Sequence, residues 1–243
     1  MAVFQAAELL IPREDLLENW AVIACDQFTS QPEYWKEVRD CVGDRPSAYH
    51  ITFPEAELGG DRTARIDSIN AHMRRYLEAD IFRRYPDAYV YVERRLFDGS
   101  VRRGVVGVID LEEYDFHSDA VSAVRATEQT VEERIPPRVR IRSGAALETS
   151  HVMLLMDDAS GRVLDSLEEK KQKLPELYRF MLMQGGDEIA GRLVQGEDAR
   201  ALDAALAAYE AETRARFAET GKAPLLYAVG DGNHSLATAK TCW

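Results

Sequence analysis

The residues best suited to chemistry lie near the end of the chain, in residues 225–240, which read LLYAVGDGNHSLATAK. An apolar, strand-forming run leads into Gly230 and Gly232, and a helix-compatible run follows directly. Glycines let backbone N–H groups approach a ligand closely, and the first turn of a helix leaves N–H donors unpaired. Asp231 and His234 add a carboxylate and an imidazole to this loop. The pattern predicts an anion-binding pocket.

The side chains of this glycine loop indicate phosphoryl chemistry. Asp231 could bind a metal ion that bridges phosphates, or act as a base toward a hydroxyl, and His234 could polarise a phosphoryl oxygen. Ser235 is placed to cap the helix or to contact a phosphate. The loop lacks the signatures of a Walker A motif and of a dinucleotide-binding GxGxxG unit. A structural alternative stays open, in which Asn233 or Ser235 is only an N-cap and Asp231 only a turn former.

A second candidate is the segment Arg125-Ala126-Thr127-Glu128-Gln129-Thr130. Glu128 lies between hydroxyl side chains, with Arg125 and Arg134 nearby in the sequence, so it could be a general base with cationic support. The alternative is a capping box, in which Thr127 and Thr130 open a short helix.

A third candidate follows a predicted buried strand at residues 20–25. Ligands often lie at the ends of strands in α/β folds, so polar side chains there could hold a substrate. The alternative is a polar turn that caps the next helix. Cys25 has no activating motif and is expected in the core, and His50, His72 and His117 are expected to be structural or exposed. The polar residues of this third candidate are Asp26, Gln27, Thr29 and Ser30.

Composition bounds the class of protein. The 243 residues are 46% hydrophobic and 30% charged, as in globular proteins, with a net charge of −12 and a pI near 5.0. The acidic balance argues against a nucleic-acid-binding surface. No apolar run approaches the ~20 residues of a membrane helix, and the N-terminus lacks a basic, signal-like start. Three widely spaced cysteines form no CxxC pair, so we expect a cytoplasmic protein without a disulfide framework.

The elements that must position these residues are predicted from periodicity and breakers. Asp98-Gly99 predicts a hairpin with a type I′ turn between residues 89–97 and 101–111. Strands and helices interleave without a strict βαβ rhythm, which predicts a mixed-sheet α/β or α+β fold. The remaining strands are expected at residues 20–25, 48–53, 151–156, 163–167, 189–194 and 225–229. Helices are expected at residues 33–41, 61–84, 138–147, 168–183 (divided at Pro175) and 198–220.

Three segments, ACDQFTSQPEYW, RATEQT with the following ERIPPR, and VGDGNHSLATAK, resemble the family catalogued as domain of unknown function 1015. The resemblance covers essentially the whole chain. Members of that family are longer, and this chain stops about two turns into the helix after the glycine loop, so we expect further sequence beyond Trp243. Two of the motifs are also similar to free serine kinases of the ParB/sulfiredoxin-like superfamily.

That second resemblance implies a function. It implies a ParB/sulfiredoxin-like core in residues 125–243, incomplete at its end, after an N-terminal α/β region at 1–124. It also implies phosphoryl transfer from ADP or ATP with Mg²⁺ to a small hydroxyl compound such as serine. Glu128 and Asp231 would be catalytic, and Gly232, Asn233 and His234 would cradle phosphates.

Two positions depart from the superfamily pattern. Ser235 stands where a phosphate-binding arginine is expected, which removes a bidentate ligand, and Thr127 replaces a histidine. A non-catalytic nucleotide sensor is therefore a second hypothesis, and Glu128→Gln would distinguish the two, because a sensor tolerates it.

The resulting hypothesis assigns each candidate residue a role, with a nucleotide and a small acceptor as partners, and with no nucleic acid or membrane. The catalytic residues are Glu128, Asp231 and His234, and Asp231 also holds the metal. The phosphate-binding residues are Gly230, Gly232, Asn233 and Ser235. The substrate-binding residues are Asp26, Gln27, Thr29, Ser30, Arg125 and Thr130.

Overall fold

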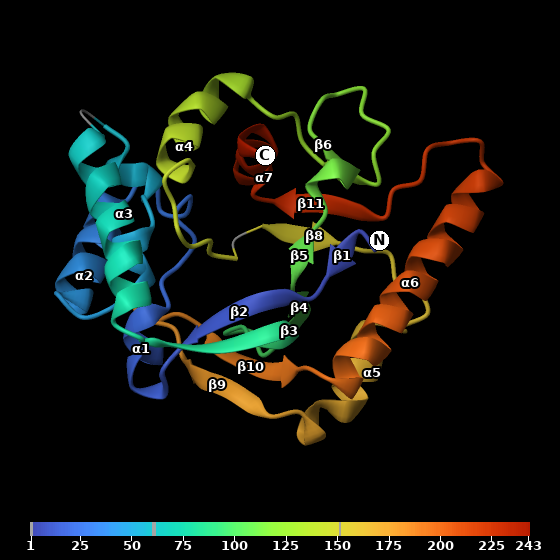
Figure 1. Cartoon of the computed structure of the whole chain (residues 1–243), viewed down its shortest axis with the longest axis horizontal. Coiled ribbons are helices and arrows are strands. Elements are labelled where there is room, and N and C mark those ends of the chain that lie inside the picture. Colours follow the sequence, from blue (N-terminus) through green and yellow to red (C-terminus); the bar gives the residue numbers. More distant parts are fainter. Residues whose placement is uncertain (1, 60–61, 151) are drawn as a thin grey trace.

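A computed structural model describes residues 2–59, 62–150 and 152–243 and shows a mixed α/β fold (Figure 1). The larger sheet has five strands in the order β2-β3-β10-β9, with β4 also paired to β3, and every pairing is antiparallel. This sheet takes strands from both sides of residue 124, the boundary expected from the sequence. Its strands are β2 (Ala7–Pro12), β3 (Phe82–Arg95), β4 (Val101–Val106), β9 (Glu176–Met181) and β10 (Glu188–Val194).

A second, four-stranded sheet carries the glycine loop. Its order is β6-β7-β11-β8, in which β7 pairs parallel with both β6 and β11, whereas β8 pairs antiparallel with β11. A two-stranded ribbon of β1 and β5 lies between the two sheets (Figure 1). The bounds are β1 (Phe4–Gln5), β5 (Val108–Ile109), β6 (Tyr114–Asp115), β7 (Val124–Ala126), β8 (Met153–Leu155) and β11 (Tyr227–Asp231).

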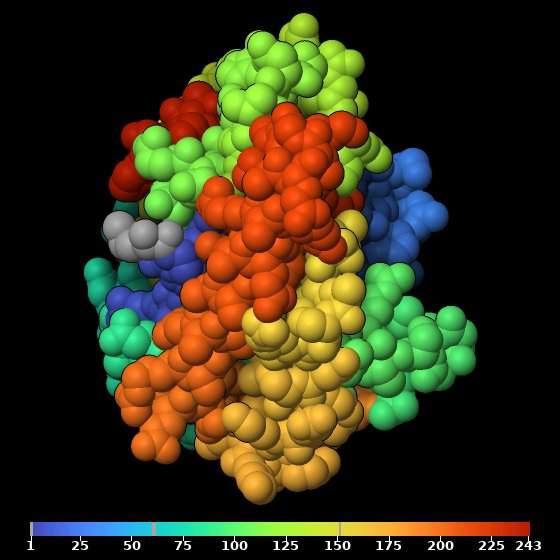
Figure 2. All heavy atoms as spheres, turned by 90° about the vertical axis from the view of Figure 1, so that its right-hand side faces the viewer, coloured from blue at the N-terminus to red at the C-terminus, as the bar shows by residue number. Residues whose placement is uncertain are grey.

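The helices surround the sheets in three groups. α2 and α3 stand together on one side, α4 and α7 cover the four-stranded sheet, and α6 runs along the opposite side (Figure 1). Figure 2 shows α6 lying lengthwise across that side of the molecule, beside the segment that contains α5. No helix in the described ranges is long and apolar enough to cross a membrane. The helices are α1 (Leu17–Trp20), α2 (Pro32–Val42), α3 (Thr63–Glu78), α4 (Ile135–Arg142), α5 (Leu164–Lys170), α6 (Glu197–Ala218) and α7 (Asn233–Cys242).

The main core lies between the two sheets and is closed by α6. Tyr89 and Tyr91 of β3, Leu206 of α6 and Val229 of β11 are all buried in it. The buried Glu210 carboxylate accepts a hydrogen bond from Val3 N at 3.0 Å, so this charge in the core is partnered. A second cluster joins α3 to the segment before it and to α4. The strand that leads to the glycine loop is therefore fixed by packing from both sheets.

Several predicted elements agree with the structure. α2, α6, β10 and β11 form where expected, and β3 and β4 form the expected hairpin. Its turn differs from the predicted type I′, which requires a positive φ at both turn residues. Gly99 has a φ of 84°, whereas the φ of Asp98 is not positive. Gly99 N donates to Leu96 O, and Leu96 N donates to Ser100 O, which is a three-residue loop.

Two predicted strands near the N-terminus are wrong. Residues 20–25 leave α1 and continue as irregular chain, and residues 48–53 instead contain a 3₁₀ helix, Ala48–Ile51. Its start is capped by Ser47, whose hydroxyl accepts from Tyr49 N at 3.3 Å. Short apolar runs do not reveal their period, and here tertiary packing decides the conformation.

The helix predicted over residues 61–84 ends earlier, at Glu78, and Pro86 lies inside β3 rather than ending a helix. The β2–β3 register shifts between Ala7 and Leu9, opposite Pro86, and Asp87 has a φ of 48°. Proline is tolerated in a strand at such a bulge because no ladder hydrogen bond is required of it.

Three further predictions in the second half of the chain need correction. Residues 163–167 begin α5 instead of a strand, and the second part of the predicted helix 168–183 is β9. β9 is a strand because it pairs with β10, a tertiary contact that local propensity does not show. The strand predicted to be buried at 151–156 is β8, in which Met153 and Leu155 are about half exposed. His151 lies outside the described residues.

α4 begins at Ile135, before the expected start at residue 138, so the proline pair lies in its first turn. Proline fits there because first-turn N–H groups have no intrahelical acceptor. This earlier start places Arg138 in the second turn of α4, within the helix rather than at its beginning.

Candidate functional site

The site is built on the parallel pairing of β7 with β11. Val124, Arg125 and Ala126 pair with Tyr227, Ala228 and Val229 in register. Parallel strands end at the same edge of a sheet, so the chain that leaves β7 and the chain that leaves β11 emerge together. Glu128 and Asp231 each lie two residues beyond the last of these pairs. The two motifs, far apart in the sequence, therefore meet at one edge.

Hydrogen bonds cross-link the two loops at this edge. Thr127 donates to Val229 O from both its backbone N, at 3.3 Å, and its hydroxyl, at 2.7 Å. Asn233 Nδ2 donates to Glu128 O at 3.3 Å, and Val131 N donates to His234 Nε2 at 3.2 Å. These bonds contradict the capping-box alternative, because Thr127 binds β11 and the next 3₁₀ helix, Glu132–Arg134, has no side-chain cap.

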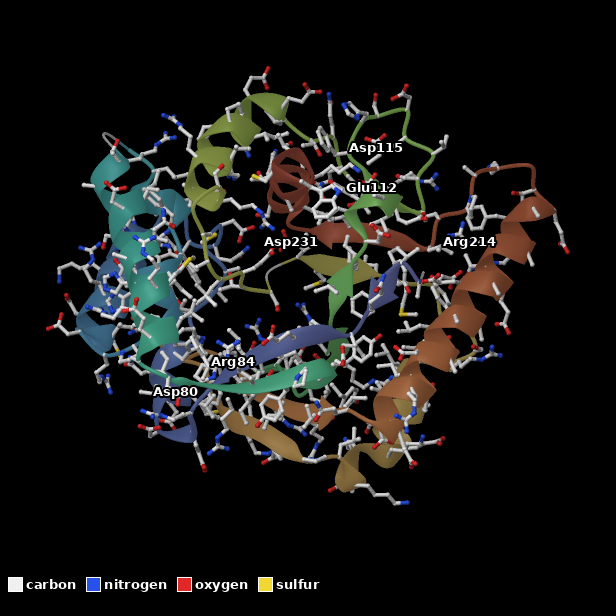
Figure 3. All side chains as sticks on the ribbon, in the orientation of Figure 1. Asp80, Arg84, Glu112, Asp115, Arg214 and Asp231 are labelled. Atoms are coloured by element: carbon white, nitrogen blue, oxygen red, sulfur yellow. The ribbon has the colours of Figure 1, made fainter. Side chains whose placement is uncertain are left out.

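The glycine loop turns sharply from β11 into α7, at the centre of Figure 3 where Asp231 is labelled. Gly232 has φ 85° and ψ 24°, a left-handed conformation that disfavours other residues, and it occupies the N-cap position of α7. Neither Asn233 nor Ser235 is the N-cap, so the capping alternative for these two residues is wrong. The helix starts at Asn233 rather than at the expected Ser235.

The first turn of α7 presents unpaired backbone donors beside a carboxylate. Leu236 N makes the first intrahelical bond, to Gly232 O at 2.9 Å, so the preceding N–H groups have no intrahelical acceptor. The exposed Asp231 carboxylate accepts from Gly232 N at 2.8 Å through Oδ1, which fixes its orientation and leaves further lone pairs. The end of β11 can thus hold an anion through backbone donors, and a cation through Asp231.

His234 is neutral at ordinary pH and ties the two loops together. Burial lowers its pKa, with help from Arg138 and Arg134, whereas Glu55 and Glu128 act in the opposite direction. Because Nε2 accepts the Val131 N–H, the proton of the neutral ring resides on Nδ1. His234 therefore contributes a structural hydrogen bond here, and only Nδ1 is left as a donor toward a ligand.

A chain of hydrogen bonds continues from His234 to the N-terminal half of the protein. Arg134 N donates to Val131 O at 3.0 Å, and Arg138 Nη1 donates to Arg134 O at 2.8 Å. Arg138 Nη2 forms an ion pair with Glu55, whose own N–H donates to Cys25 O at 2.7 Å. The three segments chosen from the sequence are linked in this way.

Sequence reasoning missed Glu55 and Arg138 as members of this site. Arg138 ends the ERIPPR segment that carried part of the family resemblance, which was a signal that could have found it. Glu55 follows Pro54 in a loop and has no local signal. Only the packing of the chain brings it to α4.

The segment predicted to hold the acceptor is joined to the site only at its beginning. Burial and the charges of Asp26 and Glu55 raise the pKa of the Cys25 thiol to about 11, which agrees with a non-nucleophilic Cys25. Trp35 Nε1 donates to Gln27 O at 3.1 Å, and Phe28 stacks on a tyrosine of α2, so this half of the segment is anchored on α2. The side chains of Gln27, Thr29 and Ser30 are exposed.

The remaining predicted residues divide into one that points away and two that are buried at the edge. Arg125 Nη2 reaches toward Ala223 O, at 3.5 Å, before the start of β11 and thus at the other end of the strand. Thr130 and Asn233 are 7% and 9% exposed, and Thr130 Oγ1 and Asn233 Oδ1 have no hydrogen-bond partner in the described protein. Unsatisfied buried polar groups are uncommon in native proteins, and strain, a catalytic role or a bound water or ion can account for them.

The described residues contain no cluster of three or more His, Cys, Asp or Glu side chains that could hold a metal ion. Mg²⁺ is usually bound by one or two carboxylates together with substrate phosphates, so Asp231 fits a metal that arrives with a nucleotide.

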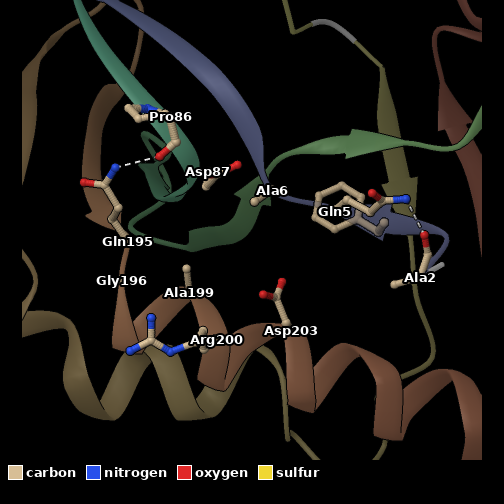
Figure 4. A pocket seen from close by; sticks show the side chains of 11 residues that line it. Ala2, Gln5, Ala6, Pro86, Asp87, Gln195, Gly196, Ala199, Arg200 and Asp203 are labelled. Atoms are coloured by element: carbon tan, nitrogen blue, oxygen red, sulfur yellow. Dashed lines mark hydrogen bonds between the residues drawn. The ribbon is translucent and has the colours of Figure 1, made fainter.

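A separate groove of about 650 Å³ lies between α6 and the start of β1, far from these loops in the sequence (Figure 4). Asp87, Arg200 and Asp203 line it, and Gln195 Nε2 donates to Pro86 O at 2.6 Å across its wall. None of the residues predicted to be functional lines it. The candidate groups meet at the strand edge and not in this groove.

Comparison with known families gives one match. A family model described as "Protein of unknown function (DUF1015)" matches residues 6–243. No curated protein and no solved structure matches the chain.

Proposed function

The chain belongs to the DUF1015 family, and we propose that it binds a Mg²⁺–nucleotide at the edge where β7 and β11 end and transfers a phosphoryl group to a small hydroxyl compound. The observation that carries this proposal is the parallel register of β7 and β11. It brings Glu128 and Asp231 to one edge, beside the unpaired donors of α7.

The proposed roles follow from position. The N–H groups at the start of α7 hold phosphate oxygens. Asp231 would hold the Mg²⁺, which would neutralise phosphate charge when bound. The Glu128 carboxylate takes the proton from the acceptor hydroxyl, whose oxygen bonds to the terminal phosphorus. The bond between that phosphorus and the leaving nucleotide oxygen breaks, and the shortened nucleotide departs with its electron pair.

The loop cross-links suit this chemistry because phosphoryl transfer depends mainly on positioning and charge neutralisation. Asn233 Nδ2 binds the carbonyl of Glu128 itself, so the proposed base and the proposed phosphate loop are held in one arrangement. Gly232 sets the direction of α7 toward the same edge.

Nucleotide binding is the first test. Calorimetry with ADP, ATP and CTP in the presence of Mg²⁺ should give micromolar binding of at least one nucleotide. Asp231→Ala should abolish it, whereas Asp67→Ala, which removes an exposed carboxylate from α3, should not. Absence of binding by all three nucleotides would overturn the proposal.

Catalysis is tested separately from binding. With serine and related hydroxyl compounds as acceptors, ³¹P NMR should detect a new phosphomonoester. Glu128→Gln should lower the rate by about 10²–10⁴-fold with nucleotide affinity retained, the usual contribution of a general base. Glu133→Gln, an exposed acid in the same stretch, is the matched control. Binding without turnover, unaffected by Glu128→Gln, would favour the nucleotide-sensor function instead.

A further inference from the structure

The proposed phosphate site has an unusual charge balance in its two loops. Asp231 and Glu128 contribute carboxylates, and Arg125 is directed toward the far end of β11. The start of α7 offers uncharged donors, namely backbone N–H groups, the Ser235 hydroxyl and His234 Nδ1. A nucleotide polyphosphate carries several negative charges and is usually met by charge-assisted donors. Besides the proposed Mg²⁺, a cationic side chain for this site would have to come from another element.

α4 supplies a candidate. α4 packs against α7 over the four-stranded sheet (Figure 1), and its Arg138 side chain is 16% exposed. Two of the five N–H donors of the Arg138 guanidinium make contacts, one with Arg134 O at 2.8 Å and one with the Glu55 carboxylate. The Arg134 side chain is exposed, and its charge also lowers the pKa of His234.

The charge of Arg138 reaches both parts of the site. Together with Arg134 it lowers the pKa of His234 on α7, and it acts in the same direction on the pKa of Cys25. The contacts agree with this: Arg138 is linked to His234 through the backbone of Arg134 and Val131. It is linked to Cys25 through Glu55, whose N–H donates to Cys25 O. The terminal phosphate of a nucleotide held by α7 would meet an acceptor between these two parts of the site.

A second observation concerns the two loops around the start of α7. Thr130 Oγ1 and Asn233 Oδ1 are buried without hydrogen-bond partners, in two residues that belong to the two loops around the start of α7. A buried polar atom left without a partner is energetically costly, so the loops carry unused hydrogen-bonding capacity here.

We propose that Arg138 is the phosphate-binding cation of this site, and that its guanidinium exchanges the Glu55 carboxylate for the terminal phosphate of the nucleotide. This inference rests on the proposed function, since it assigns a residue within the same site. Glu55 holds the guanidinium in place without ligand. Two oxygens of a tetrahedral phosphate can accept from the planar guanidinium fork as a carboxylate does, so the same side chain can bind either group.

The test compares nucleotides of increasing charge. AMP, ADP and ATP are titrated against wild type, Arg138→Gln, Arg138→Lys and Arg140→Gln, an exposed arginine on the same helix. Arg138→Gln should weaken ATP binding by about tenfold or more and AMP binding much less, because a contact to the terminal phosphate is lost. Arg138→Lys should be intermediate, because a lysine keeps the charge but not the fork, and Arg140→Gln should stay within about twofold of wild type.

Glu55→Gln is a second variant, and it is expected to change ATP affinity in the opposite direction to Arg138→Gln. Removing the competing carboxylate should leave Arg138 more available and should tighten ATP binding several-fold. Thermal melting of each ligand-free variant measures the structural role of the ion pair independently.

Three outcomes would overturn the inference. Equal loss of AMP and ATP affinity in Arg138→Gln, in step with its melting temperature, would make the ion pair a structural clamp only. Nucleotide binding that is lost in Asp231→Ala but unchanged in Arg138→Gln would overturn the role of Arg138 and leave the proposed function in place. Absence of nucleotide binding by wild type would overturn both.

Discussion

Single residues at the strand edge combine structural and chemical roles. Gly232 provides the left-handed turn, Asp231 is oriented by the Gly232 N–H, and His234 accepts the Val131 N–H. His234 was selected from the sequence as a catalytic group, whereas its Nε2 joins two loops. A side chain that holds the geometry of a site affects function through position rather than through proton transfer.

The titration of His234 gives a pH prediction. Its folded-state pKa lies below the ordinary value of 6.5, so the unfolded chain takes up the proton first as the pH falls. The contribution of neutral His234 to the free energy of unfolding is therefore complete above pH 6.5. It declines as the pH falls below 6.5 toward the pKa of His234 in the folded protein. Denaturant unfolding between pH 7 and pH 5 should show a shallower acid-side loss of unfolding free energy in His234→Gln, since glutamine accepts the same bond without titrating. An unchanged pH slope would contradict this.

The cysteines differ in their predicted reactivity. Burial raises the pKa of the Cys25 thiol to about 11, whereas Cys41 and Cys242 are exposed. The thiolate is the reactive form, so a maleimide at pH 7.5 should modify Cys41 and Cys242 well before Cys25. Peptide mass spectrometry over a time course measures the order of modification, and early labelling of Cys25 would be inconsistent with the described environment.

At the scale of elements, the meeting of β7, β11, α4 and α7 creates the site. Two parallel strands supply a common edge, α7 directs its first turn there, and α4 brings a cation alongside. The proline pair lies in the first turn of α4, which begins at Ile135. Arg138 therefore lies one turn after the start of this helix. None of these elements holds all the candidate groups by itself, and the site is formed by their relative placement.

The stability of the turn into α7 should be sensitive to the addition of a single methyl group at Gly232. Gly232→Ala forces a residue with a Cβ into φ 85°, which should lower the unfolding free energy by about 1–2 kcal/mol. Gly104→Ala in β4 is the control, since its Cβ would meet nothing within 4 Å, and it should change stability by less than about 0.5 kcal/mol. Equal effects of the two substitutions in denaturant titrations would refute the role of the turn.

At the scale of the whole molecule, the site depends on a core shared by both sheets. β3 belongs to one sheet and β11 to the other, and Tyr89, Leu206 and Val229 pack in the same cluster. α6 closes this core along one side of the molecule, as Figure 2 shows. Loss of core packing far from the site should therefore loosen the strand edge as well.

Leu206 tests that dependence. Leu206 is 2% exposed, and Leu206→Ala should lower the unfolding free energy by about 2–5 kcal/mol through lost burial and the cavity left behind. Val121→Ala, at a side chain that is 72% exposed, should cost less than about 0.5 kcal/mol. Chemical denaturation of both variants measures the difference, and a small effect at Leu206 would argue against a core shared in this way.

Much of the local structure followed from the sequence. The amphipathic patterns of α2 and α6 and the apolar run before the glycine loop were long or distinctive enough to assign. The glycine pair with Asp231 marked the turn into α7, because only glycine adopts its conformation readily. The family resemblance was confirmed by the match over residues 6–243.

Other elements depended on partners distant in the sequence. β9 is a strand because β10 pairs with it, and Pro86 fits within β3 because a bulge removes the need for its N–H. Residues 48–53 curl into a 3₁₀ helix because they pack against α3. Local propensities are weak beside such contacts, so the sequence pattern alone predicted other structures there.

The sequence by itself determined which residues could do chemistry, namely the glycine loop and Glu128, since side-chain type and local backbone freedom are local properties. The tertiary structure decided which of them meet. It joined Glu128 to Asn233, turned Arg125 away, and added Arg138 and Glu55, of which Glu55 has no local signal in the sequence. The physical reason is that a site requires proximity, and proximity between distant segments is set by strand pairing and core packing rather than by spacing along the chain.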